Sequence, residues 1–250
     1  MSDFGRGAAR STPQIVDMSI DAGLRAFMLG VYNKMALGLL LSAAIAYAVA
    51  TVPAIRDTLY VVTPTGAFAG FLPLGMVLAF APLALVLVAS FVMRNPSPTG
   101  SAALYWGIVS LIGASGAVWV LRYNAGSIAS TFLITATAFG ALSLVGYTTK
   151  KDLTGFGSFL IMGVWGLVIA SVVNIFLHAP ALYWMINAIG VLIFAGLTAY
   201  DTQRLKMTYY AIGGDKAGMA VATNYGALSL YLDFINLFQF LLAFMGGRRN

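Results

Sequence analysis

Two aspartates, Asp201 and Asp233, lie inside the last two long apolar stretches of the chain, where an acidic side chain can do chemistry. A carboxylate in the middle of a membrane costs roughly 2.5 to 3.5 kcal/mol on insertion scales, so its presence indicates a functional site. If the two groups meet in a dry site, both cannot ionise cheaply, and we expect them to share a proton. Such a pair could serve as a proton switch, as an aspartyl catalytic site, or as a source of hard oxygen ligands for Ca²⁺.

Further polar residues follow the second aspartate at helical spacing. Ser229, Asp233, Asn236 and Gln239 are separated by four, three and three residues, which places them on one face of a helix. The opposite face is Leu, Ile and Phe, so we expect this helix to be enclosed by the others. With Thr198 of the preceding stretch, these residues are candidates for an ion path. The alternative is a hydrogen-bonded ladder between helices without a transport role.

Two arginines are candidate partners of the pair. Arg94 ends the second apolar stretch on the same side and could bond one aspartate in a closed state. Its alternative role is that of a basic anchor at the membrane surface. Asp201 is also close enough in sequence to pair with Arg204 near the interface.

The elements that must position these residues are predicted from composition and hydropathy. The chain has 250 residues, of which 60% are hydrophobic and 9% charged, too few charges to cover a soluble domain. We predict an all-α membrane protein with a polar cytoplasmic tail (residues 1–25) and a single seven-helix domain (residues 26–250). The expected spans are 27–50, 66–93, 102–121, 128–147, 156–177, 182–200 and 225–245.

Orientation follows from the basic residues. With the N-terminus inside, ten of them fall on the cytoplasmic side and four outside, which favours this orientation. Seven full spans would place the C-terminus outside. The basic pair Arg248 and Arg249 argues mildly against that, and a last segment that enters and returns would satisfy it.

Composition also excludes several classes of site. There is no cysteine, which excludes disulfides and thiol nucleophiles, and His178 is the only histidine, which argues against a histidine metal site or a Ser-His-Asp triad. The net charge of +6 is explained by basic residues that flank spans, and we expect no nucleic-acid partner. No cofactor is expected.

Around the two aspartates the chain resembles the Bax inhibitor-1 family, the transmembrane Bax inhibitor motif proteins, including its bacterial YccA-like members. The resemblance covers roughly Arg25 to Gly246 and rests on two segments, Ala199-Tyr200-Asp201-Thr202-Gln203 and, more specifically, Ala227-Leu228-Ser229-Leu230-Tyr231-Leu232-Asp233-Phe234-Ile235-Asn236-Leu237-Phe238.

The resemblance implies seven helices with the last one central, in a bacterial inner membrane. It implies a pH-sensitive calcium leak, with Ca²⁺ as the permeant ion, governed by a hydrogen-bonded aspartate pair at Asp201 and Asp233 and by the arginine at Arg94. One departure concerns the second helix, where some relatives carry a carboxylate and this chain has Ala81-Pro82-Leu83-Ala84-Leu85. Ion steps that need this third carboxylate are therefore in question.

Two other functions compete with the leak. The first is a regulator that binds another membrane protein, such as a protease or a cell-death protein, without transporting ions. The second is an intramembrane aspartyl protease. Such enzymes have a glycine-flanked second aspartate, whereas Tyr231 and Leu232 precede Asp233, so we expect no enzyme activity.

Overall fold

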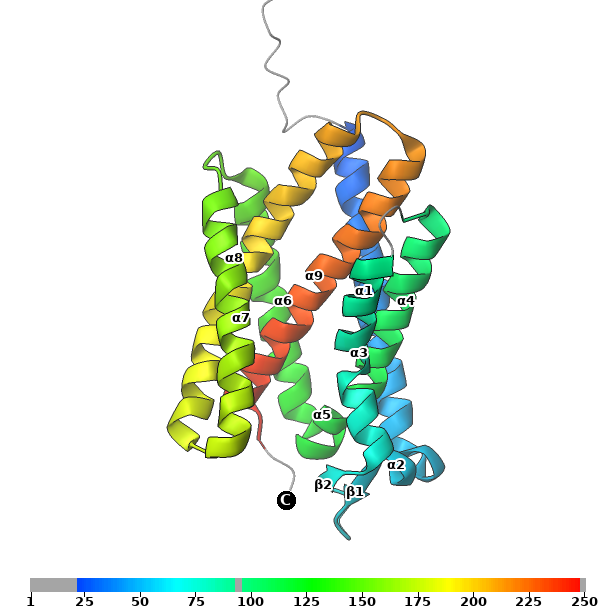
Figure 1. Cartoon of the computed structure of the whole chain (residues 1–250), viewed down its shortest axis with the longest axis vertical. Helices are drawn as coiled ribbons and strands as arrows, with labels where there is room; N and C mark the ends of the chain where they lie inside the picture. Colours follow the sequence, from blue (N-terminus) through cyan, green and yellow to red (C-terminus); the bar gives the residue numbers. More distant parts are fainter. Residues whose placement is uncertain (1–21, 93–95, 248–250) are drawn as a thin grey trace, which may run out of the picture.

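The protein is a bundle of long helices with a small hairpin at one end (Figure 1). The computed structural model describes residues 22–92 and 96–247. The elements in chain order are α1 (Ala22–Thr51), α2 (Pro53–Leu59), β1 (Tyr60–Val62), β2 (Phe68–Phe71), α3 (Pro73–Val92), α4 (Pro98–Ser115), α5 (Ala117–Arg122), α6 (Ala125–Thr148), α7 (Thr154–Leu177), α8 (Pro180–Ile212) and α9 (Lys216–Met245).

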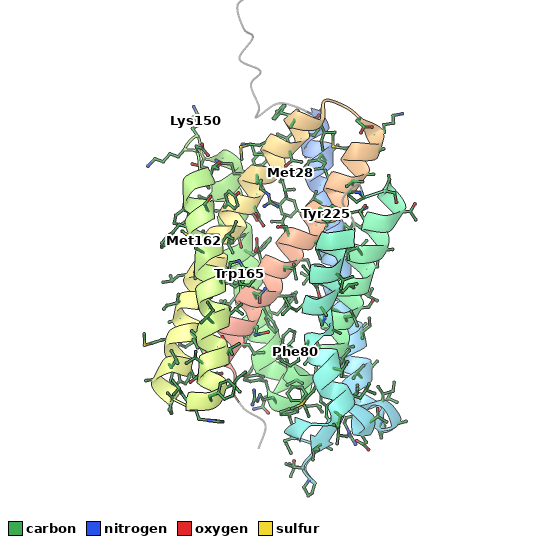
Figure 2. All side chains as sticks on the ribbon, viewed as in Figure 1. Met28, Phe80, Lys150, Met162, Trp165 and Tyr225 are labelled. Atoms are coloured by element: carbon green, nitrogen blue, oxygen red, sulfur yellow. The ribbon has the colours of Figure 1, made fainter. Side chains whose placement is uncertain are left out.

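Six segments of the described residues are long and apolar enough to cross a membrane: α1, α4 with α5, α6, α7, α8 and α9. They carry large exposed apolar side chains on their outer faces, as Met162 and Trp165 on α7 illustrate (Figure 2). Such a surface suits lipid rather than water. The prediction of a multi-pass helical membrane protein is confirmed to this extent.

The second predicted span, 66–93, corresponds to α3, which is less regular than expected. Its segment Pro73–Val86 is a shorter apolar helix, and Pro82 lies inside α3. The predicted start at residue 66 is wrong, because Phe68–Phe71 pairs with Tyr60–Val62 as an antiparallel hairpin before the helix begins. The six spans do not by themselves establish the predicted count of seven.

Helix α9 has neighbours on several sides. It packs on α8, α1, α4 and α6, whereas α7 packs mainly on α8, and α3 packs mainly on α4. The last helix therefore has four principal neighbours, which falls short of the predicted enclosure by all six others.

Several helix ends have clear local causes. Proline occupies the first helical position of α2, α4 and α8, where its missing N–H costs nothing. Asp215 caps α9 by accepting from the backbone N–H groups of Ala217 and Gly218 at 3.0 and 2.8 Å. The turn before it uses Gly213 and Gly214 with φ of 63° and 89°, a conformation that favours glycine.

The two ends of the bundle differ in charge. The end that holds the start of α1 and the α6–α7 and α8–α9 connections carries most of the basic residues described, including Arg25, Lys150 and Lys216 (Figures 1 and 2). We call it the basic end. The opposite end holds the hairpin, with Arg56 and Arg122.

Candidate functional site

The centre of the candidate site is a carboxyl pair between α8 and α9. Asp201 and Asp233 are 7% and 5% exposed, and the two helices that carry them pack against each other more extensively than any other two helices in the described part of the chain. The carboxyl groups are close enough for the charge of Asp201 to act on Asp233. Because an ionised carboxylate can only accept, a hydrogen bond between two carboxyl groups requires a proton on one of them.

Asp201 is the better-satisfied member of the pair. The hydroxyl of Ser229 donates a hydrogen bond to its Oδ2, and Nη1 of Arg204 lies 3.6 Å from its Oδ1. The Arg204 side chain is 49% exposed, and its guanidinium lies 5.9 Å from the centre of the Tyr200 ring. Arg204 therefore connects a buried carboxylate with the surface, as a long basic side chain near an interface can.

Asp233 differs because one of its oxygens has no partner. Its Oδ2 is fully buried and has no hydrogen bond to any described residue. A buried polar atom left unsatisfied costs about 1–3 kcal/mol, and more if it is charged. The pair is thus asymmetric, with one anchored carboxyl group and one that retains free acceptor capacity.

Close backbone contact places α8 beside α6 at this site. A Cβ on Gly146 would lie 2.1 Å from the carbonyl oxygen of Ala199, so only glycine fits there without displacing a helix. One turn further, Thr202 donates to the hydroxyl of Ser143 at 3.3 Å. These contacts fix the part of α8 that carries Asp201.

Gln203 and Lys206 tie the same segment to the α6–α7 connection. The Gln203 amide donates to the carbonyl of Lys151 and accepts from the N–H of Leu153, both at 2.8 Å. The Lys206 ammonium donates to the carbonyl of Tyr147 and lies 4.8 Å from its ring centre. Lys206 is therefore turned toward α6.

Helix α8 continues well beyond the predicted span. From Asp201 it runs on to Ile212, about 16 Å at 1.5 Å per residue. Asp201 therefore lies about three turns from the end of its helix, whereas the predicted span ended at residue 200.

The remaining predicted site residues are not all brought to the pair. Thr198 is buried and donates to the Phe194 carbonyl at 2.8 Å, and Asn236 donates to the Leu232 carbonyl at 2.8 Å, each within its own helix. Gln239 is exposed. Of the predicted polar face on α9, Ser229 and Asp233 belong to the pair. Arg94 lies outside the described residues, so its role remains a prediction.

The structure also contains a polar group that the sequence analysis missed. We call Lys34, Ser101, Tyr105 and Asn224 the lysine cluster. The Lys34 ammonium donates to Oδ1 of Asn224, whose amide nitrogen in turn donates to Ser101 Oγ at 2.8 Å. The Tyr105 hydroxyl donates to the Lys34 carbonyl at 2.7 Å, and the ammonium lies 5.4 Å from the Tyr105 ring centre.

This cluster holds a cation without a matching anion. Among the described residues Lys34 has no carboxylate partner, and an amide oxygen and two aromatic rings stabilise it instead, the second ring being Trp106 at 5.8 Å. The signal that could have identified it is a lone lysine inside the apolar stretch 27–50, since a charge there calls for a partner.

The pair alone is a sparse set of ligands for a metal ion. In residues 22–92 and 96–247 no group of three or more Asp, Glu, His or Cys side chains could hold one. Ca²⁺ takes six to eight oxygen ligands. Two carboxyl groups and the Ser229 hydroxyl could therefore replace only part of its water shell.

The comparisons with known proteins agree with one another. The family described as inhibitor of apoptosis-promoting Bax1 matches residues 24–250. An uncharacterized protein of Caulobacter vibrioides is 68% identical over 251 residues, covering 100% of both chains. The inner membrane protein YbhL of Escherichia coli is 44% identical over 229 residues, 91% of this chain and 94% of its own. With its apolar helices, this chain is therefore a multi-pass membrane protein that belongs to the Bax inhibitor family.

Proposed function

We propose that this protein is a pH-sensitive calcium leak of the inner membrane, with the Asp201–Asp233 pair as its gate. The calcium part of the proposal comes from the family resemblance. The proton part rests on one observation, the buried carboxyl pair in which Asp201 is anchored and Asp233 keeps an unpartnered oxygen. When such a carboxyl pair loses its shared proton, neither group can donate to the other, and each must find another hydrogen-bond partner.

The gating argument is electrostatic. With one proton, the pair holds α8 to α9 by a hydrogen bond. Without it, two negative charges repel each other at the same place. Every 1.4 kcal/mol by which this change favours an open state shifts the population about tenfold. A permeant Ca²⁺ would meet carboxylate oxygens in the deprotonated state and would keep most of its water.

The charged groups around the pair limit what else can titrate there. Arg204 acts on both aspartates, directly on Asp201 and by charge on Asp233. From α6 the nearest ionisable group is Tyr147, which contacts Lys206. Lys34, from α1, is engaged with Asn224 on another face of α9. We also propose Arg94 as a closed-state partner, as the resemblance implies.

The test is calcium flux into liposomes that contain the purified protein and a calcium-sensitive dye, measured across pH. We expect Asp201→Asn and Asp233→Asn each to flatten the pH response, because an amide keeps the shape and removes the titration. Asp57→Asn is the matched control, since Asp57 is exposed and pairs with Arg56 at the opposite end of the bundle.

Two outcomes would count against this function. Equal pH-dependent flux in the wild type and in both pair variants would defeat the gating role. An absence of calcium flux at every pH would defeat the leak itself and would favour a regulator of other membrane proteins. Arg204→Gln and Arg94→Gln, measured in the same assay, would show which arginine acts on the pair.

A further inference from the structure

A groove lies between α1 and α6. Its volume is 780 Å³, within the range typical of ligand sites. Its walls are mostly apolar residues of the two helices, and Phe234 of α9 forms part of its floor. Helix α6 packs on α8 and α9 while α1 packs on α4 and α9, so side chains of α9 separate the two walls.

The groove is open to the surroundings of the protein. Leu29, Phe132 and Leu144 line it and are 50%, 41% and 62% exposed. In a membrane protein, apolar side chains exposed along spanning helices face hydrocarbon. In the membrane, therefore, lipid is the molecule that is available to occupy the groove.

The two ends of the groove differ in polarity. Arg25, Tyr32 and Tyr147 line it toward the basic end, and Lys206 contacts Tyr147 from behind. Leu39 and Phe132 line the opposite end, and no carboxylate is among the lining residues. A ligand that fits this arrangement has a negative head at Arg25 and an apolar tail.

The length of the groove suits one leaflet. The α1 wall from Arg25 to Leu39 rises about 21 Å at 1.5 Å per residue. Half of a hydrocarbon core of about 30 Å is about 15 Å, and the difference leaves room for the headgroup region. A chain inserted alongside α1 would thus end near the middle of the bilayer.

We propose that the groove between α1 and α6 binds a glycerophospholipid of the leaflet at the basic end, with one acyl chain along the groove and its anionic headgroup at Arg25. The acyl chain contacts Leu29, Phe132 and Leu144. The phosphate is held by the Arg25 guanidinium, a planar donor that suits phosphate oxygens.

The experiment measures the phosphatidylglycerol retained by the purified full-length protein in native mass spectrometry. Gly140 lines the groove, and a Cβ there would meet no atom within 4 Å, so Gly140→Leu projects an apolar side chain into the groove from an open position. We expect retention to fall about tenfold, the change that 1.4 kcal/mol of binding free energy produces. Gly166→Leu on α7 is the matched control, since Gly166 has the same empty space and lies outside the groove.

A second arm tests the headgroup. The preference for phosphatidylglycerol over phosphatidylcholine should fall about fivefold in Arg25→Gln, since one basic residue near an anionic surface contributes about 1 kcal/mol. Lys150→Gln, which removes an exposed charge at the same end outside the groove, should leave the preference unchanged.

A wild-type measurement keeps the test independent of how the variants fold. Phosphatidylglycerol with a photoreactive group on its acyl chain should label peptides from residues 25–39 and 132–147. Labelling confined to other segments would overturn the proposal. So would equal retention in Gly140→Leu and Gly166→Leu, or a lipid-free dimer in which a second copy covers the groove.

Discussion

The carboxyl pair and the lysine cluster each join α9 to neighbouring helices, and they differ in how completely their polar atoms are hydrogen-bonded. In the lysine cluster the Lys34 ammonium, the Asn224 amide and the Tyr105 hydroxyl each have partners. In the carboxyl pair, two acidic groups adjoin each other and Oδ2 of Asp233 has no partner among the described residues.

The difference suggests a division of roles along α9. A fully satisfied buried network rigidifies its surroundings, because every rearrangement loses a hydrogen bond. A network in which some polar atoms lack partners can adopt other hydrogen-bonding arrangements of similar free energy. We therefore expect the lysine cluster to contribute mainly to stability and the carboxyl pair mainly to pH-dependent function.

We expect the largest effect from a substitution that disrupts the close contact between α6 and α8, which positions Asp201. Gly146→Ala would place a Cβ 2.1 Å from the Ala199 carbonyl oxygen and force α6 away from α8. Overpacking of this kind costs about 1–3 kcal/mol, and contact with rigid backbone places it at the upper end. We expect a clear loss of thermal stability together with altered pH dependence of flux.

Gly140→Ala on the same helix is the control, because its Cβ meets nothing within 4 Å. It should unfold at or slightly above the wild-type temperature, because alanine favours a helix over glycine, and it should match the wild type in flux. Equal melting temperatures for Gly146→Ala and Gly140→Ala would show that α6 and α8 do not need this close approach.

The next prediction distinguishes the role of the lysine cluster from that of the carboxyl pair. Lys34→Met keeps an unbranched apolar side chain and leaves the Asn224 oxygen without its donor, which we expect to cost about 1–3 kcal/mol of unfolding free energy. The pH dependence of calcium flux should remain, since the pair is untouched. Thermal unfolding and liposome flux on the same preparation measure both.

Lys216→Met serves as the control because Lys216 is exposed at the basic end. If Lys34→Met flattened the pH response as Asp233→Asn is expected to do, the division between a stabilising cluster and a titrating pair would be lost.

The smallest effect concerns an exposed aspartate. Hydrogen bonds from the hydroxyl and the backbone N–H of Thr154 lower the pKa of Asp152 below its ordinary value of 3.8. The ionised Asp152 carboxylate therefore stabilises the folded protein fully at pH values above 3.8. This stabilisation is lost as the pH falls through the lowered pKa of the folded state. Asp152→Asn should lower the melting temperature at pH 7 by less than about 2 °C, and the difference should vanish in strong acid. A difference that grew as pH fell would contradict this sign.

Much of the helical framework could be predicted because a membrane span has a simple requirement, about 20 apolar residues. Irregular features were missed because they depend on tertiary contacts. Phe68 and Phe71 read as part of the predicted span 66–93, but they pack with Tyr60 in a hairpin. The third predicted span breaks at Gly116, which separates α4 from α5.

The site shows the same limit. Asp201 and Asp233 stood out because charge is costly in apolar surroundings, a property of the residues themselves. Their partners could not be assigned in the same way. Ser229, which shares a helix face with Asp233, bonds Asp201 of the neighbouring helix instead, and Asn224 is paired with a lysine 190 residues away in the chain.

The two ends of α9 are each fastened to other helices. Near its start Asn224 bonds α1 and α4, and just after its last turn the carbonyl of Gly247 accepts from the N–H of Asn124 while its own N–H donates to Ser127, both at 3.0 Å. Sliding α9 along its axis would break both fastenings at once. Helix α9 is thus held in place along its axis. A change in protonation at Asp233 must therefore act through the neighbouring helices, which would rotate or move apart around α9.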